Sequence, residues 1–125
     1  MTAHILLVDD SGFSRRTLSH MLTTAGHTVV EAKDGLEALE CYALRKPDVV
    51  LLDMVMEGMT GMEVLQKLRE LDAEAKVVVA TADIQSSTRN EAQAGGALGM
   101  IPKPFQREQV LKIVETVIAG GVAWS

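Results

Sequence analysis

Five short apolar segments recur along the chain, and each has the length of a β-strand. They do not alternate apolar with polar residues, which is typical of parallel strands covered by helices on both faces. We therefore predict strands at residues 4–8, 28–30, 49–52, 77–80 and 98–101.

The segments between these strands show the spacing of amphipathic helices. In four of the five segments apolar residues recur every three or four positions, so each segment presents one apolar face. The four stripes comprise Leu18, Met21, Leu22 and Ala25; Leu36, Leu39 and Ala43; Val64, Leu68 and Leu71; and Val110, Val114 and Val117. Residues 86–94 are polar and end at two glycines, and we predict a weakly packed helix there.

Strands and helices alternate five times, which predicts an α/β fold of the (βα)5 type. Such a fold has a doubly wound parallel sheet with helices on both faces. If the strand order is 2-1-3-4-5, the third strand is central. All strand carboxyl ends then share one edge, where ligands bind in open sheets of this kind. With 125 residues the chain suits one domain, with a core of about residues 4–119 and a frayed tail at 120–125.

Composition narrows the classes of function. The formal net charge is −5, which argues against a nucleic-acid surface and favours proteins or cations as partners. The sequence contains no apolar span long enough for a membrane helix and no signal-peptide pattern. The single cysteine, Cys41, cannot form an internal disulfide, which fits the cytoplasm. We therefore expect a cytoplasmic protein that does not act at a membrane.

Chemically active residues follow four of the five apolar segments. Asp9 and Asp10 come after the first, Asp53 after the third, Thr81 after the fourth and Lys103 after the fifth. Two unit charges about 4 Å apart repel by roughly 4 kcal/mol at an effective dielectric near 20, and Lys103 offsets only part of that repulsion. Because Mg²⁺ is usually held by one or two carboxylates together with waters and phosphate oxygens, the pattern indicates a Mg²⁺ site.

With a cation present, two roles are open for Asp53. It is either a further metal ligand or a nucleophile that attacks phosphorus and forms an aspartyl phosphate. Phosphoryl transfer depends mainly on positioning and on neutralising the charge of the equatorial oxygens. A metal, the Lys103 ammonium and the Thr81 hydroxyl together would supply that neutralisation.

Four stretches of the sequence carry a family resemblance: LLVDDS, LLDMVMEGMTG, ATAD and PKPF. In this order and at these intervals they resemble the receiver domain of bacterial two-component response regulators. The nearest type is the free-standing chemotaxis regulator, and the likeness runs over about residues 4–119. The resemblance implies a flavodoxin-like fold and a single receiver domain over residues 1–125.

The resemblance also implies a role for each residue at the predicted edge. Asp53 would be the phosphoacceptor, and Thr81 and Lys103 would contact the phosphoryl group. Asp9 and Asp10 would hold Mg²⁺ together with Asp53. The phosphoryl group would come from a histidine kinase, a phosphotransfer protein or a small phosphodonor, and the chain would catalyse only its own phosphorylation and dephosphorylation.

Val55 and Glu57 lie in the loop that follows Asp53, beside the predicted metal site. The resemblance implies that the backbone carbonyl of Val55 is a further Mg²⁺ ligand. The Val55 side chain is apolar and cannot orient an attacking water, whereas Asp83, two residues after Thr81, could. Glu57 stands where the family motif has proline, which should loosen or re-aim the loop and adds a negative charge near the metal.

The resemblance implies a switch made of Thr81, Met100 and Pro104, with a cis peptide bond between Lys103 and Pro104. Met100 occupies the place of a Tyr or Phe whose rotation couples phosphorylation to the output face. A flexible thioether fills either of two pockets, so we expect the signal to pass through backbone and helix movement. The implied output surface comprises the fourth helix, the fifth strand and the fifth helix, where an effector protein would bind. The chain would be a monomer or a phosphorylation-dependent dimer.

Three other classes of protein remain as alternatives. A Mg²⁺-dependent phosphohydrolase with an aspartate nucleophile, like the haloacid-dehalogenase enzymes, would need an acid at Val55 and normally a cap domain. A flavin or nucleotide carrier would need a phosphate-binding loop after the first strand, where this chain has one glycine and two aspartates. A receiver that has lost phosphorylation would not keep the full set of site residues.

Overall fold

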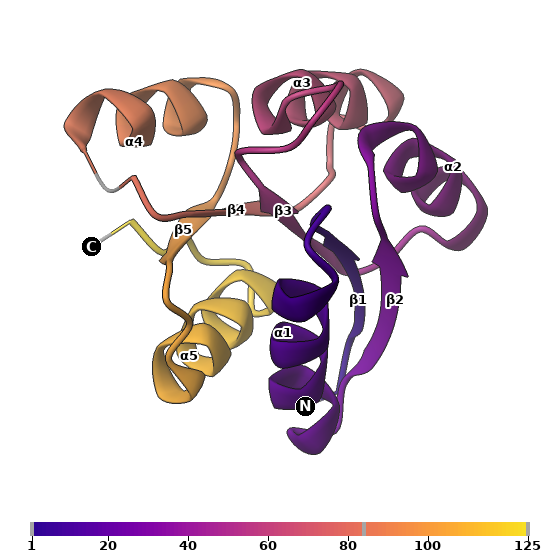
Figure 1. Cartoon of the computed structure of the whole chain (residues 1–125), viewed down its shortest axis with the longest axis vertical. Coiled ribbons are helices and arrows are strands. Elements are labelled where there is room, and N and C mark those ends of the chain that lie inside the picture. Colours follow the sequence, from indigo (N-terminus) through magenta and orange to yellow (C-terminus); the bar gives the residue numbers. More distant parts are fainter. Residues whose placement is uncertain (1, 84, 125) are drawn as a thin grey trace.

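The computed structural model describes residues 2–83 and 85–124, which form a three-layer α/β structure (Figure 1). All neighbouring strands are parallel, in the order β2-β1-β3-β4-β5 that the sequence predicts. The strands are β1 (His4–Val8), β2 (Thr28–Ala32), β3 (Val49–Asp53), β4 (Val77–Thr81) and β5 (Gly99–Pro102). The helices are α1 (Gly12–Thr24), α2 (Gly35–Arg45), α3 (Gly61–Leu71), α4 (Ser86–Ala94) and α5 (Arg107–Ile118).

Each face of the sheet carries its own apolar core. Because alternate residues of a strand point to opposite faces, Ile5 and Leu7 join one core while Leu6 and Val8 join the other. Helices α1 and α5 cover the first face, and α2, α3 and α4 cover the second, below and above the sheet in Figure 1. Burial on both faces explains why the strands are continuous apolar runs.

Side-chain caps fix where three of the helices begin. Ser11 caps α1, Asp34 caps α2, and Thr60 with Glu63 forms a capping box at α3. Helix α4 begins without a side-chain cap hydrogen bond and buries only Ala92 among its nine residues, as expected from its polar sequence. Across the described ranges, no helix is both long enough and apolar enough to cross a membrane.

The buried face of α2 differs from the predicted one. The prediction placed Leu36, Leu39 and Ala43 on the core side, but Leu36 is 64% exposed and Ala43 is also exposed. Ala38 and Tyr42 are buried instead, and Leu39 is only partly buried. The stripe is shifted by one position because the Tyr42 ring packs in the core while its hydroxyl donates a 2.8 Å hydrogen bond to the carboxylate of Asp72, the residue that follows α3.

The predicted stripe of α3 is correct except at its end. Val64 and Leu68 are fully buried, together with Leu65 between them. Leu71 is the last residue of the helix and is 56% exposed. The apolar face therefore ends one turn before the helix does.

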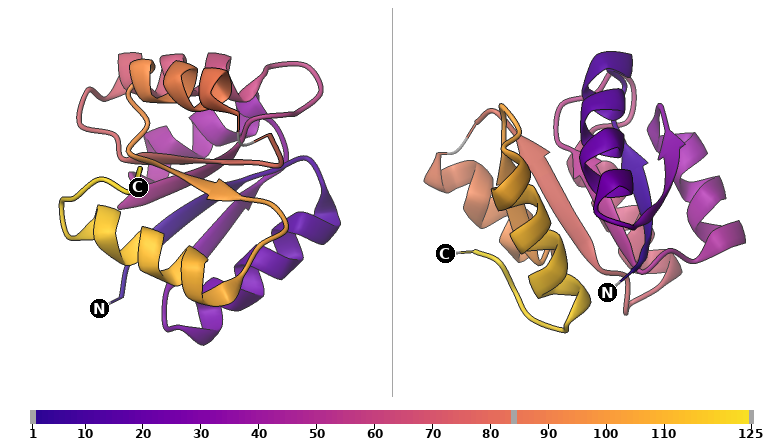
Figure 2. Two further views of the ribbon diagram at one scale, coloured as in Figure 1. Left: turned by 90° about the vertical axis from the view of Figure 1, so that its left-hand side faces the viewer. Right: turned by 90° about the horizontal axis from the view of Figure 1, so that it is seen from below.

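The segment after α5 is not the frayed tail that the sequence predicts. Ala123 forms an isolated parallel bridge with Gly99 of β5, and Trp124 packs against the core on the α4 side. In the left view of Figure 2 this end of the chain lies in front of β5, between α4 and α5. Ala123 and Trp124 explain the difference, because each packs against one of the two cores.

Candidate functional site

The predicted site residues meet at the edge formed by the strand carboxyl ends. Asp9 and Asp10 follow β1, Asp53 ends β3, Thr81 ends β4 and Lys103 follows β5. One carboxylate oxygen from each aspartate lies within 4.8 Å of the other two. The Lys103 Nζ lies 3.2 Å from Asp53 Oδ1. The ends of β1, β3 and β5 therefore contribute to one cluster.

The three carboxylates form a donor set that suits a hard divalent cation. Carboxylate oxygens are the protein ligands that Mg²⁺ prefers, and the ion also keeps several waters. Asp9 and Asp53 are 4% and 5% exposed, whereas Asp10 is exposed, so solvent reaches the cluster from one side. Val55 lies in the turn beside this cluster, and the metal-ligand role of its carbonyl stays a prediction.

Lys103 forms ion pairs with two carboxylates of the acidic cluster. Its Nζ lies 3.2 Å from Asp53 Oδ1 and 3.6 Å from Asp9 Oδ2. Burial raises the pKa of Asp53, the charge of Asp9 raises it further, and Lys103 opposes both effects. The net excess of negative charge is what a bound cation would neutralise.

Backbone and side-chain donors fix the position of Asp9. The Ser11 N–H donates to Asp9 Oδ1 at 2.9 Å, and the Arg15 Nη1 donates to the Asp9 carbonyl oxygen at 2.7 Å. Arg15 also pairs with Glu31, just before the end of β2, at 3.2 Å. Sequence reasoning missed Arg15 as part of the site, because one partner follows β1, the other lies in β2, and no local spacing connects them.

Glu57 anchors the loop after β3 instead of loosening it. Its backbone N–H donates to Asp10 Oδ2 at 3.1 Å, while its side chain is exposed. Proline has no N–H, so the residue usual in this family could not form the bond. The departure from the family motif therefore gives Asp10 a positioning donor, which the sequence analysis did not foresee.

Glycine at the start of α3 lets the loop fold back on Asp53. The Gly61 N–H donates to the Met54 carbonyl at 3.2 Å. A Cβ atom on Gly61 would lie 2.5 Å from the Asp53 carbonyl oxygen and 2.6 Å from the Met54 Cα. The Val55 N–H donates to Asp53 Oδ1 at 3.3 Å. Close approach of two backbones therefore fixes the Asp53 turn.

Thr81 is connected to the beginning of α4. Its Oγ1 accepts a 3.0 Å hydrogen bond from the Asp83 N–H, and its side chain is buried. Asp83 in turn accepts from the Gln85 N–H at 3.1 Å and from the Thr88 Oγ1 at 2.7 Å. These bonds lower the pKa of Asp83, with that from Thr88 as the largest cause. Thr81 thus contacts the segment that caps α4.

The remaining predicted switch residues, Met100 and Pro104, lie on and after β5. Met100 is partly buried and packs against the core on the α4 side. The Lys103–Pro104 bond is cis, as the family resemblance implies. The Lys103 N–H donates to the Thr81 carbonyl at 2.9 Å, so the chain leaving β5 stays attached to β4 at the site.

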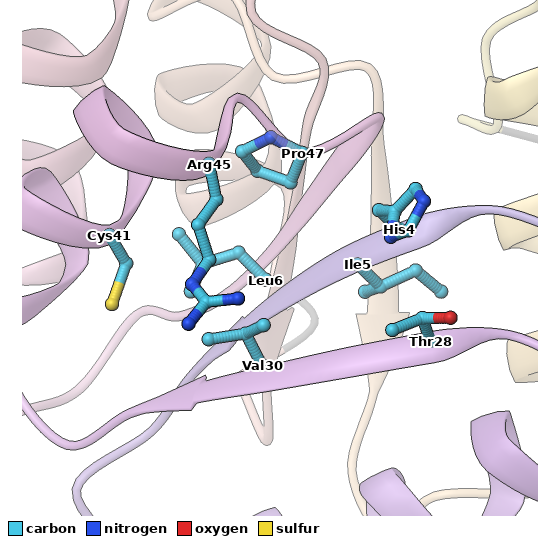
Figure 3. A pocket seen from close by; sticks show the side chains of 8 residues that line it. All are labelled: His4, Ile5, Leu6, Thr28, Val30, Cys41, Arg45 and Pro47. Carbon is cyan, nitrogen blue, oxygen red and sulfur yellow. The ribbon is translucent and has the colours of Figure 1, made fainter.

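A separate cavity of about 320 Å³ lies at the other end of the sheet (Figure 3). His4 and Thr28, the first residues of β1 and β2, contribute to its wall, and Arg45 extends from α2 toward Val30. Cys41 also lines it, and burial followed by the charge of Glu37 raises the pKa of its thiol. The thiol therefore stays protonated at neutral pH, and the cavity contains none of the predicted site residues.

Comparison with known proteins agrees with this geometry. Residues 5–115 match the family described as response regulator receiver domain. The chain is 37% identical to the chemotaxis protein CheY of Thermotoga maritima over 118 residues, which cover 94% of this chain and 98% of that protein. It therefore belongs to the response regulator receiver family and is a CheY-like signalling domain.

Solved structures support the same assignment. The CheY4 structure from Vibrio cholerae has a TM-score of 0.88 and 34% sequence identity, and covers 92% of this chain and 98% of that one. A CheX–CheY–BeF3–Mg²⁺ complex from Borrelia burgdorferi has a TM-score of 0.88 and 32% identity, with 91% and 87% of the two chains covered. Receiver domains of this kind are signalling switches rather than classical enzymes, which disfavours the phosphohydrolase alternative.

Proposed function

We propose that this chain is a phosphoacceptor switch in which Asp53 accepts a phosphoryl group in a Mg²⁺-dependent reaction. One observation carries the proposal. Three carboxylates, Asp9, Asp10 and Asp53, offer oxygens within 4.8 Å of one another while Lys103 stands 3.2 Å from the central one. This arrangement combines a metal donor set, a nucleophile and a cation for a phosphoryl oxygen.

The proposed roles follow from the position of each side chain. Asp9, Asp10, Asp53 and the Val55 carbonyl would hold Mg²⁺, and the bound ion would neutralise charge on the phosphoryl oxygens. A carboxylate oxygen of Asp53 forms the new bond to phosphorus as the bond to the donor group breaks. The Lys103 ammonium then pairs with one phosphoryl oxygen.

Thr81 would donate its hydroxyl hydrogen to another phosphoryl oxygen. The bond that its Oγ1 accepts from the Asp83 N–H would connect a movement of the Thr81 side chain to α4. In this proposal the chain catalyses only its own phosphorylation and dephosphorylation. Val55 stands where an aspartate-nucleophile phosphohydrolase would carry an acid, which supports the switch over the enzyme.

The proposed partners follow from the same function. A histidine kinase or phosphotransfer protein would supply the phosphoryl group, and an effector protein would bind the surface formed by α4, β5 and α5. We place this exchange in the cytoplasm, in keeping with the unpaired Cys41. The chain would act as a monomer or as a dimer that forms on phosphorylation.

Intact-mass measurement after incubation with acetyl phosphate and Mg²⁺ tests the proposal. The chain should gain the mass of one phosphoryl group, and EDTA or Asp53→Ala should abolish the gain. Asp48→Ala is a matched control, because this exposed aspartate lies at the opposite end of β3, and it should be phosphorylated normally. An unmodified wild-type chain, or equal modification of Asp53→Ala, would contradict the proposal.

A further inference from the structure

The chain reverses direction immediately after α5. Gly120 has a φ of 96°, the left-handed conformation that favours glycine. Its N–H donates to the Val117 carbonyl at 3.0 Å, and the Gly121 N–H donates to the Thr116 carbonyl at 2.9 Å. This pair of bonds is the Schellman arrangement that ends a helix and redirects the chain. The residues that follow therefore run back toward the sheet.

The returning residues 122–124, here called the edge segment, add to the outer side of β5. The Ala123 N–H donates to the Leu98 carbonyl at 2.7 Å, and Ala123 pairs in parallel with Gly99. A Cβ atom on Gly99 would lie 3.0 Å from both the Cβ and the carbonyl oxygen of Ala123. The absence of a side chain at Gly99 therefore allows the segment to approach this closely.

Trp124 attaches the edge segment to α4. Its ring packs against the core on the α4 side, and the Arg89 guanidinium lies 5.9 Å from the ring centroid. A cation–π contact at such a site is weak, and the segment forms only an isolated bridge with β5. Val122 is 60% exposed. The edge segment is therefore docked by few contacts and can be displaced at low cost.

The contact with Arg89 lies close to the connection between α4 and the phosphoryl site. Thr81 Oγ1 accepts from the Asp83 N–H, and Asp83 accepts from Thr88, the residue before Arg89. A rotation of the Thr81 side chain that moves Oγ1 toward a phosphoryl group on Asp53 would break the bond that Oγ1 accepts from the Asp83 N–H. Helix α4 has no side-chain cap hydrogen bond from its N-cap residue, so little else holds its first turn in place.

We propose that the edge segment covers a peptide-binding edge of β5 in the unphosphorylated chain and leaves it when Asp53 is phosphorylated. This inference rests on the function proposed above and adds its regulation. Movement of α4 separates Arg89 from Trp124, and the segment is then held only by its isolated bridge to β5 and by the core packing of Trp124. The backbone groups on the outer side of β5 become available to a partner.

The partner is a protein that lays an extended segment parallel to β5. A strand added to an exposed sheet edge gains backbone hydrogen bonds, and side-chain pockets give the selectivity. The edge segment shows the chemistry that fits, with a small residue opposite Gly99 followed by an aromatic residue beside Arg89. A large side chain opposite Gly99 would prevent binding.

Fluorescence of Trp124 tests the inference directly, because it is the only tryptophan in the chain. Acrylamide quenching should be stronger in Gly99→Val than in the wild type by roughly twofold, because an indole forced out of its site is more accessible. Adding Mg²⁺ with beryllium trifluoride, a phosphoryl mimic, should raise wild-type quenching toward the variant value. Fluorine NMR of the bound mimic reports separately whether Asp53 is occupied.

A second pair of variants tests the docking of Trp124 independently of whether Gly99→Val folds. Arg89→Ala should also increase quenching, whereas Arg107→Ala, an exposed arginine at the start of α5, should leave it unchanged. Quenching that is the same in the wild type, Gly99→Val and Arg89→Ala would overturn the docking. A signal from the bound mimic with unchanged quenching of Trp124 would overturn the release of the edge segment on phosphorylation, but not its docking in the unphosphorylated chain. No bound-mimic signal in the wild type, or an equal signal in Asp53→Ala, would instead count against the proposed function.

Discussion

At Asp53 a buried carboxylate stands beside the second buried carboxylate of Asp9, and Lys103 is the cation that faces both. Burial is the largest cause that raises the pKa of Asp53, followed by the charge of Asp9. The charged form that can attack phosphorus is therefore the form that the metal-free fold disfavours. A cation at the site would remove that conflict, which makes Mg²⁺ part of the nucleophile's activation.

Asp53→Asn should stabilise the metal-free chain at neutral pH. A raised folded-state pKa means that the folded chain keeps a proton at Asp53 more readily than the unfolded chain does. The resulting stability is complete below the ordinary pKa of 3.8 and is lost as pH rises through the raised value. Asp53→Asn should therefore be more stable than the wild type at neutral pH, and this difference should disappear in acid. Midpoints of urea unfolding measured in EDTA would show the difference.

Addition of Mg²⁺ provides the control for this variant. A ligand that binds only the folded state stabilises it, so Mg²⁺ should stabilise the wild type more than Asp53→Asn. Asp48→Asn, at an exposed aspartate away from the site, should change neither result, because asparagine keeps an oxygen that can accept the bond from the His4 N–H. A variant less stable than the wild type in EDTA would show that burial of the Asp53 charge and its repulsion by Asp9 are not the dominant effects.

Glu57→Pro should weaken Mg²⁺ binding through loss of one backbone donor. The Glu57 N–H donates to Asp10 Oδ2 at 3.1 Å, and proline removes it. One hydrogen bond contributes about 1 kcal/mol, which corresponds to roughly a fivefold loss of affinity. Glu57→Ala is the matched control, because alanine keeps the N–H while removing the same carboxylate. Calorimetric affinities that are equal in the two variants would contradict the positioning role.

At the scale of elements, the junction between β3 and α3 depends on one glycine. A Cβ on Gly61 would lie 2.5 Å from the Asp53 carbonyl oxygen, and backbone cannot yield as a flexible side chain does. Gly61→Ala should therefore lower the free energy of unfolding by about 2–3 kcal/mol, as strain at a tight backbone contact does. Denaturant unfolding measures this loss.

Gly12→Ala is the matched control for that substitution. Gly12 is the first residue of α1, and the nearest atom to an added Cβ is the Arg16 Nη1 at 3.4 Å, the end of a flexible side chain. Alanine is also the better helix former, so Gly12→Ala should be neutral or stabilising. Similar losses in both variants would mean that the Gly61 contact carries no special strain.

Helices α2 and α3 are connected by the hydrogen bond from the Tyr42 hydroxyl to Asp72 Oδ2, at 2.8 Å. That bond is the largest cause that lowers the pKa of Asp72, while burial and then the same bond raise the pKa of Tyr42 to about 12. The stability from Asp72 is present above its ordinary pKa of 3.8 and is lost as pH falls through the lowered value. The stability from Tyr42 is present below 10.0 and is lost as pH rises toward 12.

Tyr42→Phe should therefore be less stable than the wild type between these two limits, and the difference should shrink on both sides. Thermal midpoints measured across the pH range test this dependence. Asp72→Asn keeps an oxygen acceptor but does not titrate. Its stability should therefore no longer fall in acid through this bond, while the fall in stability at high pH should remain. A stability difference between Tyr42→Phe and the wild type that is constant with pH would rule out the bond as its cause.

At the scale of the whole molecule, the sequence was sufficient for the sheet and for the convergence of the acidic residues. Strands buried on both faces leave an unmistakable run of apolar residues, and parallel order brings their carboxyl ends together. Asp9, Asp10 and Asp53 were therefore predictable as neighbours. The order of strands and the cis bond before Pro104 came with the family resemblance, since no local pattern specifies either.

The features that escaped prediction depend on contacts between distant residues. Tyr42 is buried because Asp72, 30 positions later, satisfies its hydroxyl. Arg15 contacts Asp9, which follows β1, and Glu31 in β2. The segment that carries Trp124 docks beside β5 because Gly99 has no side chain there. Periodicity reports which face of an element is apolar, but it contains no information on partners that only the folded chain brings together.

Chemical trapping at Asp53 tests the central claim most directly. Borohydride reduces an aspartyl phosphate to homoserine, so peptide mass spectrometry identifies the residue that carried the phosphoryl group. After incubation with acetyl phosphate and Mg²⁺, we predict homoserine at position 53, and none when EDTA is present. Homoserine at Asp9 or Asp10, or at no position, would contradict the account of Asp53 as the phosphoacceptor.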